Sequence, residues 1–161
     1  MPESPVVSNT TPLISLVGIG QLDLLRQLYG AIWIPTAVLA EYQAGAQPSH
    51  PNLAAIPWIV VHTVVVEPTL AAILDPGEAE AIALARAVQA RVVILDELRG
   101  RRVAQQAGLP LIGSLGVLLR AKQVGLITTV APLIHAMIGQ GRRISPARQA
   151  RIMAAAGESP A

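Results

Sequence analysis

The sequence predicts a three-layer α/β/α domain with a four- or five-stranded, mainly parallel sheet, and three observations predict it. Short apolar runs alternate along the chain with longer segments of helical periodicity, as in βαβ units. The runs are apolar throughout, which is typical of strands that helices cover on both faces. A chain of 161 residues with 52% hydrophobic and 14% charged residues is also long and apolar enough for one such domain.

The first half of the chain predicts three strands and three helices. Thr11 followed by Pro12 begins the first helix, because proline is favoured in a first turn, and Gly18 ends it. Three prolines between Ala46 and Pro57 indicate a loop or a short connecting helix. The expected elements are strands at 5–8, 31–34 and 58–66 and helices at 11–18, 22–28 and 36–43.

The second half repeats the alternation and ends in helices. Pro68–Leu74 predicts one or two helical turns, and Asp75-Pro76-Gly77 predicts a turn before the next helix. Strands are expected at 92–95 and 109–112 and helices at 97–107, 115–124 and 130–156, the last broken near 139–141 and restarted at Ser145-Pro146. We therefore expect an α/β domain over residues 1–145 and a C-terminal helix and tail over 146–161.

Composition and missing motifs exclude several classes of function. The chain has no cysteine and three separated histidines, so any metal would be held by oxygen, which favours Mg²⁺ or Mn²⁺. Two Trp, two Tyr and no Phe provide no stacking platform for bases. No glycine-rich phosphate loop is present. No long apolar stretch predicts a membrane span, and no secretion signal is evident, so we expect a cytoplasmic protein without membrane partners.

The ten acids are few enough for their positions to be informative. Solvent-exposed roles suit four of them (Glu3, Asp23, Glu67 and Glu158), and Asp75 fits a turn. The remaining candidates are Glu41, Glu78, Glu80, Asp96 and Glu97, joined by the amide Asn9. In a doubly wound sheet, Asn9 and Asp96 follow strand ends, while Glu41 and Glu78 lie on helices that can reach the same crevice.

Simpler interpretations of these residues stay open. Glu78 and Glu80 can be favourable charges in a first helical turn, worth about 0.3–1 kcal/mol each. Asp96 can cap the helix that follows it, and Asn9 or Thr11 can cap the first helix. Eleven of the twelve basic residues are arginine, which suits phosphate binding, but these arginines can equally form a solvated face.

Four segments in series resemble PIN-domain proteins, specifically the subgroup known as DUF3368. They are VVSNTTPLI, IPTAVLAEY, GEAEAIALA and VVILDELRGRRVAQQAGLPLIGSLGVLLRAKQVGLI, and together they span residues 5–145. PIN domains have the α/β/α fold predicted above. Many are Mg²⁺- or Mn²⁺-dependent ribonucleases, and some are toxins of toxin–antitoxin pairs. The resemblance therefore implies RNA as substrate, an antitoxin as partner and a homodimer, which the apolar helices near Ile14 to Leu28 also suggest.

The resemblance also assigns the site. Four acidic positions of the family fall on Asn9, Glu41, Glu78 and Asp96. Catalytic roles are expected for Glu41, Glu78 and Asp96, and metal ligation for Asn9, Glu78 and Asp96. Glu80 and Glu97 are auxiliary acids, and Arg99, Arg101 and Arg102 are candidates for binding nucleic acid. Such a metal would supply hydroxide and neutralise phosphoryl charge.

Asn9 departs from the family, which has an aspartate there, and this removes one negative charge from the expected metal site. Two hypotheses follow. In the first, the protein is a metal-dependent endoribonuclease that tolerates the change. In the second, it is a module that binds nucleic acid or an antitoxin without cutting RNA.

Overall fold

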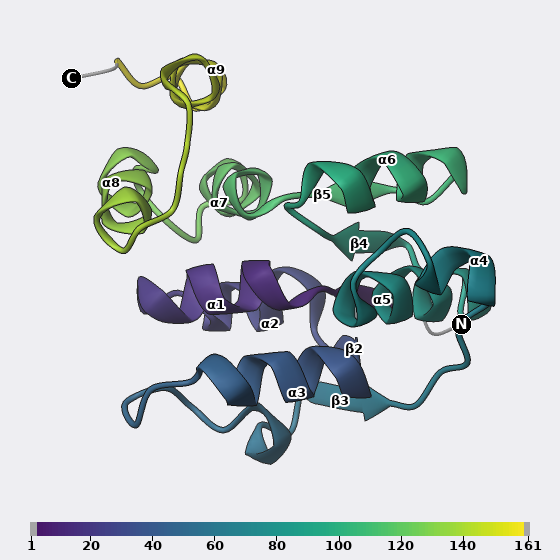
Figure 1. Cartoon of the computed structure of the whole chain (residues 1–161). Coiled ribbons are helices and arrows are strands. Elements are labelled where there is room, and N and C mark those ends of the chain that lie inside the picture. The colour runs from purple at the N-terminus through teal and green to yellow at the C-terminus, as the bar shows by residue number, and fades with distance from the viewer. Residues whose placement is uncertain (1–2, 160–161) are drawn as a thin grey trace.

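The computed structural model describes residues 3–159 and contains five parallel strands in one sheet. They are β1 (Val6–Ser8), β2 (Ile32–Pro35), β3 (Ile59–His62), β4 (Val92–Ile94) and β5 (Leu111–Ile112). The strand order is β3-β2-β1-β4-β5, and every neighbouring pair is parallel. Helices flank this sheet, so the predicted three-layer α/β/α class is confirmed (Figure 1).

The helices begin and end close to the glycines and prolines that mark them in the sequence. They are α1 (Thr10–Gly18), α2 (Asp23–Tyr29), α3 (Thr36–Gly45), α4 (Pro68–Ala71), α5 (Pro76–Ala87), α6 (Leu98–Gln106), α7 (Ser114–Gln123), α8 (Ala131–Gly139) and α9 (Pro146–Ala155), with a 3₁₀ turn η1 (Leu53–Ala55). The main difference lies in the extended segment expected at 58–66. Its ladder ends at His62, and Val65 beyond it is 91% exposed.

Adjacent residues of each strand point to opposite faces of the sheet and enter different cores. Val6 and Ile94 pack with residues of α1, α2, α3 and α7, whereas Val7 and Val93 pack with residues of α4, α5 and α6. The two-residue period of a strand explains this division. All four side chains are fully buried, which is why the strands read as continuous apolar runs.

The order of the strands creates a switch point between β1 and β4. From β1 the chain moves outward through β2 to β3, then returns to the other side of β1 to form β4 and β5. Ligands of open α/β sheets bind beyond the carboxyl ends of the strands at such a point. Asn9 directly follows β1, and its backbone N–H donates to the Ile94 carbonyl at 3.0 Å, so the two strand ends are joined there.

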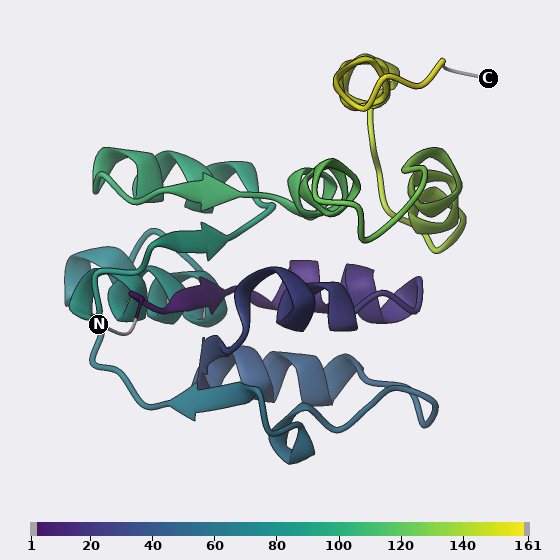
Figure 2. The ribbon, with the colours of Figure 1, turned by 180° about the vertical axis from the view of Figure 1, so that it is seen from behind.

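The last helix lies at one end of the molecule, beyond α7 and α8 (Figure 2). An extended segment connects it to α8, and α9 packs against α7. Over residues 3–159, no helix has both the length and the apolar character needed to cross a membrane.

Candidate metal and nucleic-acid site

Asn9 presents a buried carbonyl oxygen at the switch point. The residue is 2% exposed and occupies the N-cap position of α1, yet its side chain makes no capping hydrogen bond. Within residues 3–159, its Oδ1 atom has no hydrogen-bond partner. An unpaired acceptor in a buried position is costly, and a bound cation is one way to satisfy it. The alternative in which Asn9 caps the first helix through its side chain is therefore wrong.

Glu41 joins three helices through its two oxygens. Its Oε2 accepts from the Thr10 hydroxyl at 2.7 Å, and its Oε1 accepts from the Gly77 backbone N–H at 2.9 Å. Thr10 lies in α1 and Gly77 in α5, so Glu41 on α3 fixes both relative to the switch point. The carboxylate is partly buried, and both of its oxygens are held by other elements of the fold.

Glu78 lies in the first turn of α5 and is 7% exposed. In the described part of the chain, its Oε2 atom has no hydrogen-bond partner. Burial raises the pKa of Glu78 to about 7, with further contributions from the adjacent Asp75 carboxylate and the charge of Glu97, while Arg99 acts in the opposite direction. The site therefore disfavours the charged form of Glu78 unless a cation is present.

Asp96 has an 8% exposed side chain whose oxygens are already engaged. Oδ1 accepts from the Ser114 backbone N–H at 2.7 Å, and Oδ2 accepts from the Ser114 hydroxyl. Arg142, from the segment between α8 and α9, approaches Oδ2 at 3.3 Å. Asp96 thus holds the first turn of α7, while Glu97 is the N-cap residue of α6, so the proposed capping of the following helix by Asp96 is wrong.

Each of these three carboxylates lies against a glycine. A Cβ at Gly77 would be 2.5 Å from Glu41 Oε2, and one at Gly100 would be 2.6 Å from Glu78 Oε2. A Cβ at Gly113 would be 2.8 Å from Asp96 Oδ1. A side chain at any of these positions would force the carboxylate to move, so the glycines leave the room that the carboxylates occupy. The pattern was not predicted, because the glycines are distant in sequence from Glu41 and Asp96.

The auxiliary acids expected from the sequence lie to either side of these residues. Glu80 accepts from the Ala37 N–H at 3.1 Å and from the Thr36 hydroxyl at 3.3 Å, so it caps the start of α3. Glu97 is exposed and accepts from the Thr11 hydroxyl at 3.2 Å. The structure gives Glu80 a structural partner and leaves Glu97 at the solvent edge near Glu78.

The three arginines expected to contact nucleic acid differ in their surroundings. Arg101 donates to the Leu95 carbonyl at 2.7 Å and lines a groove beside Asp96. Arg99 is exposed and acts electrostatically on Glu78. Arg102 is exposed on the same helix.

Three further polar residues contact the proposed site residues, and the sequence did not predict these contacts. Asp75 caps α5, accepting from the Glu78 N–H at 2.8 Å, and its charge acts on the Glu78 carboxyl group. The spacing of Asp75, Pro76 and Glu78 is a capping-box signal that could have shown this. Ser114 and Arg142 contact Asp96 from 18 and 46 residues away, and no local pattern marks such contacts.

The donor set fits a hard divalent cation in part. Across residues 3–159, no three His, Cys, Asp or Glu side chains are grouped so that they could hold a metal ion. Two of the buried side-chain oxygens without partners among these residues, the amide oxygen of Asn9 and a carboxylate oxygen of Glu78, are nevertheless of the kind that Mg²⁺ prefers. Mg²⁺ commonly keeps several waters and needs only one or two carboxylates from the protein.

The fold and these residues define the class: an α/β/α domain with acids gathered around the switch point of a parallel sheet. A family model described as DUF3368, PIN domain, matches residues 5–158, so the chain belongs to this family. PIN domains form a nuclease-like superfamily, which generally uses divalent metals. No curated protein and no solved structure matches the chain.

Proposed function

We propose that this protein is a Mg²⁺- or Mn²⁺-dependent endoribonuclease that hydrolyses phosphodiester bonds of cytoplasmic RNA. The observation that supports it most directly is that a buried oxygen of Asn9, directly after β1, and one of Glu78, in the first turn of α5, have no hydrogen-bond partner among the described residues. Asn9, Glu78 and Asp96 are the proposed ligands, some of them through water. When bound, the ion would supply a hydroxide at neutral pH and neutralise phosphoryl charge.

The protein's own side chains then have distinct roles in this proposal. Glu41 positions α1 and α5 through Thr10 and Gly77. Glu78 has a pKa of about 7 in the metal-free site, so it would lose its proton on binding the ion and hold it as a carboxylate. Arg99 and Arg101 offer donors to the phosphate of the substrate.

The direct test is cleavage of single-stranded and structured RNA by the full chain with Mg²⁺ or Mn²⁺. We expect cleavage by the wild type and its loss in Glu78→Gln and Asp96→Asn variants that remain folded. Glu67→Gln, which removes an exposed carboxylate elsewhere, is the matched control and should cleave normally. If wild type and Asp96→Asn are indistinguishable with both ions on several RNAs, the nuclease proposal fails.

A second candidate function is binding of nucleic acid or an antitoxin without hydrolysis. Asn9 lacks the charge of the aspartate that the family has there, and both oxygens of Asp96 are occupied by Ser114, with Arg142 close to one of them. Both features weaken the hold on a cation. Under this alternative, RNA binds with the same affinity with and without Mn²⁺, and no cleavage accompanies it.

We also propose a homodimer, with an antitoxin as a second partner when the protein acts as a toxin. Much of the apolar surface between Ile14 and Leu28 is buried within the chain itself, including Leu16, Leu24 and Leu25. Ile14, at 40% exposure, remains available to a second copy. Light scattering at micromolar concentration should give twice the chain mass, and a monomer would contradict the dimer.

A further inference from the structure

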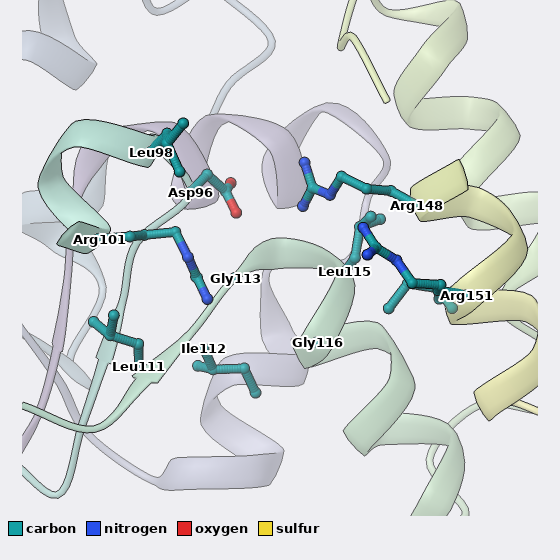
Figure 3. Close-up of a pocket in the computed structure, with 11 residues that line it drawn as sticks. Asp96, Leu98, Arg101, Leu111, Ile112, Gly113, Leu115, Gly116, Arg148 and Arg151 are labelled. Atoms are coloured by element: carbon teal, nitrogen blue, oxygen red, sulfur yellow. The ribbon is translucent and has the colours of Figure 1, made fainter. Parts of the chain in front are cut away.

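A groove of about 580 Å³ opens beside Asp96, between β5, α6 and α7 on one side and the C-terminal helix α9 on the other (Figure 3). Its near wall is formed by the start of α6, by β5 and by the first turn of α7, and its far wall by α9. Arg101 extends into it from α6, while Arg148 and Arg151 reach it from α9 (Figure 3). Three arginines from two distant segments thus line one groove.

The charge of this groove is positive. Asp96 is the one acid among its lining residues, and hydrogen bonds from Ser114 together with Arg142 already compensate that carboxylate. Arg101 uses one N–H on the Leu95 carbonyl and keeps its other donors. Among residues 3–159, Arg148 and Arg151 take part in no ion pair. Such arginines match phosphate oxygens, which accept two parallel hydrogen bonds from one guanidinium.

The placement of Arg148 and Arg151 depends on an anchored helix. Ser145 caps α9 by accepting from the Arg148 N–H at 3.2 Å, and Met153 on the helix is 4% exposed. Beyond the helix, the Glu158 carboxylate accepts from Lys122 and from the backbone of Val130, each at 2.8 Å. Arg148 and Arg151 lie three residues apart on one face of α9 and both line the groove, while the buried Met153 anchors the opposite face of the helix.

The other lining residues indicate what kind of ligand fits. The floor is aliphatic, with Leu111, Ile112 and Leu115, and no aromatic ring lines the groove for bases to stack on. The volume lies within the range of about 300–1,000 Å³ typical of small-ligand sites, which suits one or two nucleotides of a single strand rather than a duplex. Recognition would therefore act through phosphates, not base identity.

We propose that this groove binds the phosphodiester backbone of a single-stranded nucleic acid and leads it past Asp96. The inference rests on the proposed function in treating that strand as the substrate. It adds a surface on α9 to the arginines of α6, and it makes the C-terminal helix part of the binding site.

The test is fluorescence anisotropy of short labelled RNA and DNA strands of the same sequence, titrated with the full chain in EDTA. We expect Arg148→Gln/Arg151→Gln to lower affinity about tenfold or more and to reduce the slope of log affinity against log salt by about 1.4, since each phosphate contact on a single strand contributes about 0.7. Arg26→Gln/Arg86→Gln changes the net charge equally outside the groove and should cost less than about twofold. Arg148→Lys/Arg151→Lys keeps the charge without the planar fork and should fall between the two.

The outcomes separate this inference from the nuclease proposal, because binding is measured without a divalent ion. We call Arg148→Gln/Arg151→Gln the groove variant. Equal losses of RNA affinity in this variant and in Arg26→Gln/Arg86→Gln would overturn the groove proposal. Unchanged RNA affinity in a folded groove variant would overturn it too. Tighter binding of a polyglutamate peptide than of RNA, with the same dependence on Arg148 and Arg151, would assign the groove to an acidic protein partner instead. Loss of RNA and DNA binding in the groove variant, in a protein that shows no cleavage, would support the groove and refute the nuclease.

Discussion

Glu78 is a carboxyl group in a place that disfavours its charge, and this has a consequence for stability. Its pKa of about 7 in the folded protein lies above the ordinary value of 4.5, because burial and the neighbouring Asp75 oppose ionisation. Protonated Glu78 therefore stabilises the folded state fully below about pH 4.5. This stabilisation is lost as the pH rises through about 7 and the group ionises. In the absence of metal, the wild type should be less stable at pH 8 than at pH 5 on this account.

Glu78→Gln should remove that pH dependence, since the amide is neutral at every pH. Relative to wild type, we expect its free energy of unfolding in EDTA to be higher by about 1–2 kcal/mol at pH 8, after allowing for solvent screening, and nearly unchanged at pH 4. Urea unfolding at both pH values measures this. Glu67→Gln, at an exposed position, is the control, and equal shifts in the two variants would contradict the assignment.

Gly100 gives the Glu78 carboxylate its space, and an alanine there tests the packing. Its Cβ would lie 2.6 Å from Glu78 Oε2 and 3.2 Å from Leu95 Cδ2, so Gly100→Ala should lower the free energy of unfolding by about 1–3 kcal/mol. Gly45→Ala is the matched control, since it also lies in a helix but its Cβ would meet no atom within 4 Å. Alanine at an open helical position should be neutral or stabilising. Urea unfolding in which both variants are equally stable would show that the carboxylate does not fill this space.

The position of helix α9 depends on Glu158, which lies three residues beyond the end of the helix at Ala155. Glu158 was expected to be solvated, yet it binds Lys122 and the N–H groups of Val130 and Ala131, and the Lys122 hydrogen bond holds its pKa below the usual range. Glu158→Gln should loosen α9, with amide exchange over 146–156 rising about tenfold in hydrogen-exchange mass spectrometry while β1 and β4 stay protected. Unchanged exchange in α9 would mean that Met153 alone anchors it.

The elements were predictable because their signals are local. Proline at 12, 76 and 146 and glycine at 18 and 45 mark helix boundaries that the structure reproduces within a residue or two. The third strand was overextended because Val64, Val65 and Val66 favour extended backbone, whereas the hydrogen-bonded ladder with β2 ends at the pair Pro35 and His62. The last residue of a strand is set by where its hydrogen bonds to the neighbouring strand end. The sequence of the strand itself does not show this point.

At the scale of the whole molecule, the topology predicted where polar residues gather but not how they pair. Strand ends placed Asn9 and Asp96 near the switch point, as expected. The same reasoning could not show that Glu41 would take the Gly77 N–H, that Glu80 would cap α3, or that Asp96 would be held by Ser114. Each of these contacts joins residues 18 or more positions apart, and only the packed fold selects among them.

Asn9→Asp tests how the switch point couples ion binding to the stability of the entire chain. A buried carboxylate at position 9 should lower the metal-free unfolding free energy by about 1–3 kcal/mol, because an unpaired charge replaces a neutral amide. Bound Mn²⁺ stabilises the folded state in proportion to affinity, so the rise in Tm with added Mn²⁺ should be larger in Asn9→Asp than in wild type.

The matched control for this experiment is Asn52→Asp, because Asn52 is an exposed asparagine that caps the short turn η1. It adds the same charge away from the switch point and should leave the Mn²⁺ response of Tm at the wild-type level. Equal Mn²⁺ responses in the two variants would mean that Asn9 does not face the ion. A response confined to Asn9→Asp would instead identify the missing aspartate charge as the reason for a weak metal site in the natural chain.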